Sequence, residues 1–337
     1  MKRGASGLSL LVGIDKPTCM SSHDVVNHIR HIFQEKRVGH TGTLDPLATG
    51  VLPICVGPAT RLSAYLTSHD KYYRVRLVFG AQTETDDRDG SIIRSAVVPD
   101  EVLDPFFAQS FLDSLVGIHK QLPPVYSAIK VNGVKACDAA RRGNIIDLAP
   151  RDIEVFSAQL EGISGHGFAE ERAWDVSFHV SKGTYIRSLV RDIGTALDTY
   201  AYVDALRRTR AGKLGEEACV SLEVLEDIGA DASLDPVQML GFRFAFVDDK
   251  ALTDVENGKA LSRDTLTLYA FPPLSLREKG CGCTSGLIKS CEAPAESELV
   301  SIVGKNRLYG IYEYCTESDF FKPRCVFQSG VCRGTVV

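Results

Sequence analysis

Strand-like and helix-like patterns alternate irregularly along the first 240 residues, and this irregular order limits the possible folds. In residues 72–80 the apolar side chains occupy every second position, which is typical of a strand with one buried face. In residues 185–197 they recur every three to four positions, which predicts an amphipathic helix. No regular strand–helix–strand repeat connects such segments. The sequence therefore predicts an α+β domain.

Other elements follow from the same reasoning. Residues 8–14 predict a buried strand, and Ser21 or Ser22 is expected to cap a helix. Residues 101–117 are predicted to be helical, and residues 174–180 to form a strand. The apolar positions of the 101–117 helix are Val102, Phe106, Phe107, Phe111, Leu112 and Leu115.

The charges of this 337-residue chain are unevenly distributed, although its formal net charge is only −5. Residues 1–80 contain ten Lys and Arg against five acidic residues, whereas residues 81–120 contain three against eight. A locally basic surface suits RNA, but an uneven and inert surface explains the same numbers. No apolar run approaches the roughly 20 residues that cross a bilayer. We therefore expect a soluble, cytoplasmic protein.

The composition changes near residues 235–246, where we expect a domain boundary. Short strand-like segments follow, together with a predicted loop at residues 272–297 that is rich in Pro, Gly, Cys and Ser. Thiolates of Cys281, Cys283 and Cys291 could bind zinc, but their spacing is unusual and no fourth ligand is evident. Free thiols are the favoured interpretation, so no metal site is predicted.

The segment GHTGTLDPLATG, from Gly39 to Gly50, contains the first candidate for chemistry. Its glycines allow the backbone to approach a ligand closely. Asp45, placed before Pro46, could be a nucleophile or base on a rigid loop. A structural Asp-Pro turn explains the same residues, and these residues alone favour that turn.

Six blocks in order now identify the chain as similar to the TruB family of pseudouridine synthases. They cover most of residues 8–214, and six ordered matches make a chance resemblance improbable. The blocks are DKP at 15–17, GHTGTLDPLATG at 39–50, DKYYRV at 70–75, PPVYSAIK at 123–130, SKGTYIR at 181–187 and LRRTRAG at 206–212.

The resemblance implies the pseudouridine synthase fold for residues 1–240, with a mixed, mainly antiparallel central sheet and flanking helices. A thumb-like RNA-binding segment is expected near residues 121–150. The implied reaction converts one uridine, uridine 55, to pseudouridine in the T-arm loop of tRNA after the base is flipped out. Because substrate and product are isomers, no cofactor is required. The sequence contains neither a P-loop nor a dinucleotide fingerprint.

The resemblance also assigns catalytic roles. Asp45 becomes the nucleophile, and Arg187 is the partner that keeps its carboxylate ionised. Tyr73 offers an aromatic face to the flipped uracil and could assist proton removal. The alternatives are a surface charge for Arg187 and core packing for Tyr73.

The expected RNA contacts come from the same blocks. His40 would touch the RNA loop and occupy space left by the flipped base, or else be satisfied within its turn, and Tyr185 would pack beneath the site. Residues 246–337 resemble the small PUA β-barrel, which would touch the acceptor stem; an unrelated β-rich appendage is the alternative. We expect a monomer that binds tRNA. The candidate phosphate contacts are Lys16, Lys130, Lys182, Arg207 and Arg208, each of which could also be a solvated charge.

Two residues depart from the family pattern. Cys19 stands where the family usually has glycine, and Cys137 where it often has tyrosine. Two other functions remain open, a non-catalytic chaperone that folds tRNA and the catalytic subunit of a guide-RNA-directed particle.

Overall fold

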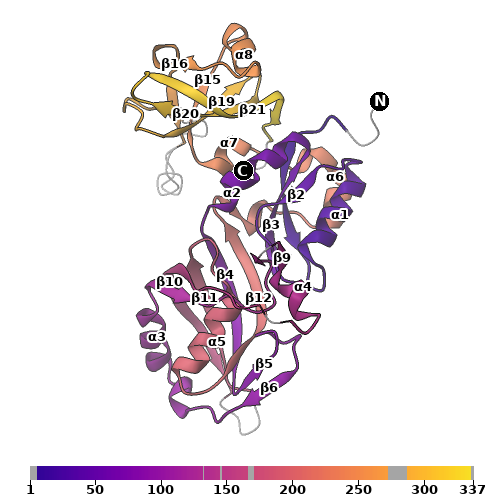
Figure 1. Ribbon diagram of the computed structural model, residues 1–337, viewed down its shortest axis with the longest axis vertical. Helices are drawn as coiled ribbons and strands as arrows, with labels where there is room; N and C mark the ends of the chain where they lie inside the picture. The colour runs from indigo at the N-terminus through magenta and orange to yellow at the C-terminus, as the bar shows by residue number, and fades with distance from the viewer. Residues whose placement is uncertain (1–5, 132, 145, 166–170, 272–286, 335–337) are drawn as a thin grey trace.

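The computed structural model describes residues 6–131, 133–144, 146–165, 171–271 and 287–334. A ten-stranded sheet forms the larger part of the molecule, and a seven-stranded sheet lies at one end of it (Figure 1). The strands of the larger sheet are β1 (Leu10–Lys16), β2 (Val38–His40), β3 (Thr49–Val56), β4 (Lys71–Phe79), β7 (Gly117–Gln121), β10 (Arg151–Ser164), β11 (Ala173–Val180), β12 (Ala201–Ala211), β13 (Leu214–Gly215) and β14 (Ser233–Leu234).

The larger sheet is mixed and mainly antiparallel, as predicted. Its order is β14-β1-β3-β12-β4-β11-β10-β7, with β2 beside β3 and β13 beside β12. Strands β3 and β12 run parallel, whereas β12 pairs with β4 in the antiparallel sense. Two short ribbons lie outside the sheet, and they are formed by β5 (Ala81–Thr83) with β6 (Ile92–Ser95) and by β8 (Lys130–Val131) with β9 (Val134–Lys135).

The helices lie between and beside these strands. They are α1 (Ser22–Ile32), α2 (Ser63–Thr67), α3 (Pro105–Ser114), α4 (Ala136–Ala140), α5 (Ile186–Ala196), α6 (Leu222–Ile228), α7 (Pro236–Leu240) and α8 (Asp249–Glu256). The start of α1 is as predicted, because the Ser21 side chain accepts a hydrogen bond from the Asp24 amide at 3.1 Å and Asp24 accepts one from the Ser21 amide at 2.9 Å. This reciprocal capping satisfies two amides that would otherwise lack partners.

The helix predicted at residues 101–117 differs from α3 in its bounds and in its buried face. Asp104 accepts a hydrogen bond from the Phe106 amide at 2.8 Å and so begins the helix at Pro105. That start turns Ala108 and Leu112 inward. Phe106 is 88% exposed and Phe107 also faces solvent, so these two apolar positions lie outside the buried face of the helix.

Two apolar cores lie on opposite faces of the larger sheet. Alternate side chains of β4, including Val75 and Leu77, pack on one face with buried residues of α1, α3 and α5. On the other face, Leu11 and Val51 belong to a core that continues into the second sheet through residues such as Phe327. The first core is the one that leads to the candidate active site.

The second sheet contains β15 (Arg243–Phe246), β16 (Leu261–Ser262), β17 (Leu268–Ala270), β18 (Ile288–Lys289), β19 (Leu299–Gly304), β20 (Arg307–Cys315) and β21 (Phe320–Cys332). Its order is β16-β21-β20-β19-β15-β17-β18, and Leu252 and Val255 of α8 pack in its core. This curled sheet is the expected small β-rich C-terminal unit (Figure 1). Among the described residues, every helix is too short or too polar to cross a bilayer.

Candidate active site

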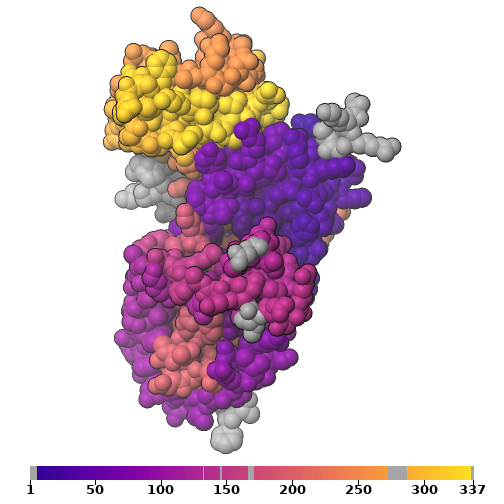
Figure 2. Space-filling view, in the orientation of Figure 1, coloured from indigo at the N-terminus to yellow at the C-terminus, as the bar shows by residue number. Residues whose placement is uncertain are grey.

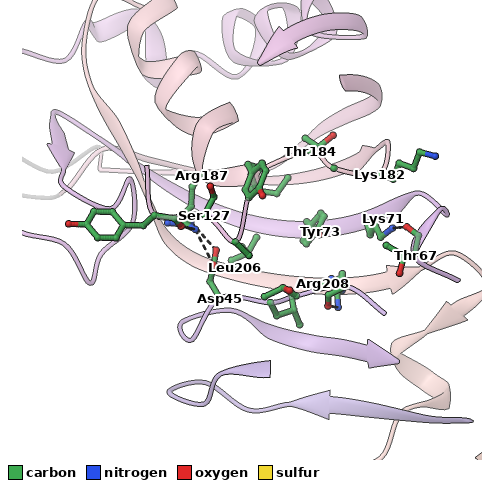
Figure 3. Close-up of a pocket in the computed structure, with 18 of the residues that line it drawn as sticks. Asp45, Thr67, Lys71, Tyr73, Ser127, Lys182, Thr184, Arg187, Leu206 and Arg208 are labelled. Carbon is green, nitrogen blue, oxygen red and sulfur yellow. Dashed lines mark hydrogen bonds and ion pairs between the residues drawn. The ribbon is translucent and has the colours of Figure 1, made fainter. Parts of the chain in front are cut away.

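Asp45 and Arg187 form an ion pair, although 142 positions separate them in the sequence. Asp45 lies on the loop between β2 and β3, and Arg187 lies in the first turn of α5. The Arg187 Nε atom is 2.8 Å from Asp45 Oδ2, and its Nη2 atom donates to Oδ1 at 3.0 Å (Figure 3). The carboxylate side chain is 32% exposed, whereas the guanidinium side chain is 5% exposed. A reactant can therefore reach the carboxylate while the arginine stays buried behind it.

Arg187 also binds two further segments. Its Nη1 atom donates to the carbonyl of Thr85 at 2.9 Å, and Nη2 donates to the carbonyl of Tyr126 at 3.0 Å. The Asp87 carboxylate lies 3.7 Å from Nη1, and burial raises the pKa of Asp87. One guanidinium thus joins the Asp45 loop, the acidic turn that follows β5 and the segment that precedes β8.

The Asp45 carboxylate opens into a cavity of about 650 Å³. This volume lies in the range of small-molecule sites. Tyr73, on β4, is largely buried and lies between the Asp45 end and a basic end that contains Lys71 and Lys182 (Figure 3). The predicted site residues that line the cavity are Asp45, Tyr73, Lys182, Tyr185, Arg187 and Arg208.

Lys71 lines the same cavity but was not among the predicted site residues. Its Nζ atom donates to the carbonyls of Thr67, at 2.9 Å, and His69. Burial lowers the pKa of Lys71 to about 8, and the charge of Arg208 acts in the same direction. The sequence held a signal for this residue, because Lys71 shares the inward alternation of Tyr73 and Val75.

Arg208 supports the Asp45 loop. It is 1% exposed, and it donates to the carbonyls of Val51, at 2.7 Å, and Gly42, at 3.1 Å. The backbone of β12 also approaches Gly50 closely, since a Cβ atom on Gly50 would lie 2.2 Å from the Arg208 carbonyl oxygen. Gly50 has a φ of +97°, so both its conformation and its neighbour require glycine.

Lys16 is fully buried and lies outside the cavity lining. Its Nζ atom donates to the carbonyls of Pro17, at 2.7 Å, Met20, and Pro46, at 3.3 Å. Burial lowers the pKa of Lys16 to about 8, although the charge of Asp45 opposes that shift. An ammonium enclosed in this way stabilises the turn after Asp45, and it has no path to an RNA phosphate at the surface.

The other predicted RNA contacts lie away from the cavity. Arg207 donates to both carboxylate oxygens of Asp15, at 2.9 and 3.0 Å, and these hydrogen bonds raise the pKa of Arg207. The His40 Nδ1 atom accepts a hydrogen bond from the Gly42 amide at 3.4 Å, and burial lowers the pKa of His40. Lys130 is exposed on β8.

The thumb-like segment covers part of the cavity. Tyr126, Ser127, Ala128, Cys137 and Arg141 contribute to the lining. In Figure 2 this magenta segment lies across the front of the larger part of the molecule. The position of Cys137 at the cavity wall was not evident from the sequence, because the short helix α4 places it there.

The described residues contain no group of three or more His, Cys, Asp or Glu side chains arranged to bind a metal. Cys281 and Cys283 lie outside the described residues, and Cys291 is exposed. The zinc hypothesis for this loop is therefore not tested.

Fold and site together define an α+β enzyme with an arginine-paired carboxylate at the wall of a nucleotide-sized cavity. A solved chain from an H/ACA ribonucleoprotein bound to a substrate RNA containing 2′-deoxyuridine has the same fold, with a TM-score of 0.64 and 21% identity. That alignment covers 94% of this chain and 84% of the other.

Family models identify the chain. The model of the N-terminal domain of TruB family pseudouridylate synthases matches residues 30–186, and that of the C-terminal domain of tRNA pseudouridylate synthase B matches residues 187–239. The tRNA pseudouridine synthase B of Caldanaerobacter subterraneus is 37% identical over 74% of this chain and 85% of its own length. That of Blochmanniella pennsylvanica is 40% identical over 70% and 86%. The chain belongs to the TruB family, so the predicted family and enzyme class are confirmed.

Proposed function

We propose that this enzyme converts uridine 55 in the T-arm loop of tRNA to pseudouridine, with Asp45 as its nucleophile. The relatives above are named tRNA pseudouridine synthase B, which supports tRNA as the substrate. One observation supports the nucleophile most strongly: the Asp45 carboxylate is accessible from the cavity while Arg187 contacts both of its oxygens.

The reaction needs few chemical groups. The bond between ribose C1′ and uracil N1 breaks, a bond between C1′ and C5 forms, and the hydrogen on C5 is replaced by one on N1. A carboxylate oxygen of Asp45 can attack the ribose or the ring and leave again unchanged, so the atoms balance without a co-reactant. Arg187 fixes the direction of both oxygens before the nucleotide arrives, which lowers the cost of orienting them.

The two ends of the cavity suggest how the nucleotide lies. The uracil would occupy the Asp45 end, with its face against Tyr73 and its edge near Tyr185. A backbone phosphate would then meet Lys71 and Lys182 at the basic end. Lys71 has a third ammonium hydrogen for such a phosphate, since its Nζ atom already donates to two carbonyls.

The remaining contacts are assigned by position. Lys130 and the thumb-like segment near residues 121–150 would grip the RNA beside the cavity, and His40 would contact its loop. We assign catalysis to residues 1–240, and contact with the acceptor stem to a PUA-like unit of residues 246–337 that contains the predicted 272–297 loop. Lys16 and Arg207 are left out of the phosphate contacts because three carbonyls enclose the Lys16 ammonium and Arg207 is paired with Asp15 and Glu216. We propose a cytoplasmic monomer.

The test compares the protein with its Asp45→Asn variant on an unmodified T-arm hairpin. Pseudouridine is mapped chemically at every uridine, and binding of the same hairpin is measured in parallel. We expect product at uridine 55 with the unchanged enzyme, no detectable product with the variant, and binding within about threefold for both, because asparagine is isosteric with aspartate. Product formation by the variant would overturn the role of Asp45. If the unchanged protein binds the hairpin but forms no product, the result would favour the function of a non-catalytic chaperone.

A further inference from the structure

A second arginine on α5 lies one turn beyond Arg187 and makes a similar set of contacts. The Arg191 Nη1 atom donates to Asp86 Oδ2 at 3.1 Å, and its Nη2 atom donates to the carbonyl of Leu122 at 2.9 Å. Nη2 also donates to Asp192 Oδ1 at 3.0 Å. Arg191 is not part of the cavity lining.

Arg187 and Arg191 fasten the same two segments. Residues four apart lie on one face of a helix, so both guanidinium groups point to one side of α5. Each arginine binds the acidic turn, through the carbonyl of Thr85 and the carboxylate of Asp86 respectively. Each also binds the segment that leads into the thumb, through the carbonyls of Tyr126 and Leu122.

The segment from residue 121 to 126 has further attachments at both ends. The Gln121 side chain donates to the carbonyl of Tyr185 at 3.1 Å and accepts from the Tyr185 amide at 2.9 Å. The hydroxyl of Tyr126 donates to Glu84 at 2.6 Å. The Leu122 carbonyl lies between these attachments, so its bond to Arg191 determines how the segment runs past Arg187.

We propose that Arg191 and Asp86 form a positioning pair that keeps the Thr85 and Tyr126 carbonyls in place for Arg187, and thereby orients Asp45. The side chain of Asp86 is only 10% exposed and that of Arg191 is 20% exposed, so each charge relies on the other for part of its solvation. Asp86 also has a φ of +60°, a left-handed conformation that aspartate tolerates in turns.

Loss of this pair acts on catalysis without touching the substrate. If the Leu122 carbonyl moves, the Tyr126 carbonyl moves with it, and the guanidinium of Arg187 loses one of the acceptors that fix its plane. Displacement of a catalytic group by about 1 Å can lower a rate by about a hundredfold. A smaller displacement transmitted through Arg187 should lower the chemical step more than it lowers RNA binding.

The test uses Arg191→Met, which keeps much of the side-chain stem but removes the fork of donors. Arg172→Met is the matched control, because Arg172 has a largely buried side chain, an aspartate partner and carbonyl acceptors, none of which belongs to α5, the acidic turn or the thumb-like segment. Single-turnover rates on the T-arm hairpin, hairpin binding and hydrogen exchange are measured for both. We expect Arg191→Met to lower the rate about tenfold, with binding within about twofold, and Arg191→Lys to recover part of the loss.

Hydrogen exchange separates this inference from the proposed function on which it rests. We expect faster exchange in residues 84–87 and 122–128 of Arg191→Met, and no such change in Arg172→Met. Equal rate losses in the two variants, or unchanged exchange in both segments, would overturn the inference. If the unchanged enzyme makes no product, the proposed function fails and exchange alone decides the positioning role. If Arg191→Met does not fold, Asp86→Asn replaces it in the same comparison.

Discussion

The Asp45 loop and the thumb-like segment face the same cavity but are attached to the protein very differently. Buried side chains bind the loop from several sides. Arg208 donates to the Gly42 carbonyl and Lys16 to the Pro46 carbonyl, and the Ser22 hydroxyl accepts from the Leu44 amide at 2.8 Å. The start of the thumb-like segment is anchored through Tyr126, but among the described residues from 128 to 147 only Ala136 and Ala139 are buried. Regions with few buried contacts open most easily. We therefore call the Asp45 loop the fixed region of the site and the thumb-like segment its adjustable region.

Arg208→Met should give the largest effect, because Arg208 holds the fixed Asp45 loop in place. It leaves the buried carbonyls of Val51 and Gly42 without their donors. We expect the free energy of unfolding, measured with urea, to fall by about 3 kcal/mol, and activity to be lost with it. The control is Arg210→Met on the same strand, where a partly exposed side chain lies 4.0 Å from Glu217 and a change within about 0.5 kcal/mol is expected. Similar losses in both variants would contradict the comparison.

The fixed region was only partly predictable from the sequence. The alternation of β4 and the cap of α1 were read correctly, because both are local patterns. No strand was predicted at β12, although it lies at the centre of the sheet. Its register shifts between Val203 and Ala205 and again between Arg208 and Arg210, and each irregularity breaks the two-residue period.

Local sequence patterns also could not predict that two of the basic side chains are buried. Lys16 and Arg208 sit in blocks that resemble the TruB family and were predicted to contact phosphates, and a lysine or arginine is usually exposed. Their burial depends on carbonyls supplied by residues far away in sequence, such as Pro46 for Lys16 and Val51 for Arg208. Sequence position identified the segments that meet at the site, but not which charges face the cavity and which support the loop.

Lys71 tests whether the basic end of the cavity binds a phosphate of the RNA. Lys71→Met should lower kcat/KM about tenfold at pH 7, mainly through KM, because a phosphate loses a buried cation. Burial sets the pKa of Lys71 near 8, so the lysine is charged below pH 8 and neutral above it. We therefore expect kcat/KM of the unchanged enzyme to fall as the pH rises through about 8.

The pH dependence has an internal control. Lys16 titrates in the same range, so Lys71→Met should retain part of the alkaline fall. Lys71→Arg stays charged and should keep more activity than the unchanged enzyme at pH 9, which steady-state assays can measure. An unaltered KM in Lys71→Met at pH 7 would show that this end of the cavity does not bind phosphate.

Arg141 tests the adjustable side. This exposed thumb residue lines the cavity, and its partner Asp138 lies 3.7 Å away on the same short helix. Arg141→Ala should leave the free energy of unfolding within about 0.5 kcal/mol, because exposed ion pairs contribute little. It should raise KM about threefold by removing one contact to RNA. Arg142→Ala changes the exposed neighbour outside the cavity lining and should leave KM unaltered. A stability loss above 1 kcal/mol would place the thumb with the fixed region.

Cys19→Gly should have the smallest effect and the opposite sign. Cys19 has a φ of +61°, in the left-handed region where a Cβ atom costs about 1–2 kcal/mol, and this explains why the family usually has glycine there. The greater freedom of glycine in the unfolded chain offsets part of that gain. We therefore expect the free energy of unfolding, measured with urea, to rise by about 0.5–1 kcal/mol. We expect kcat to stay unchanged, because the buried Lys16 ammonium already fixes the turn through the Pro17 and Met20 carbonyls on either side of Cys19. Cys19→Ala serves as the control, because it removes the thiol but keeps the Cβ atom and should change nothing. A gain of the same size in Cys19→Ala would assign the effect to the thiol and not to backbone conformation.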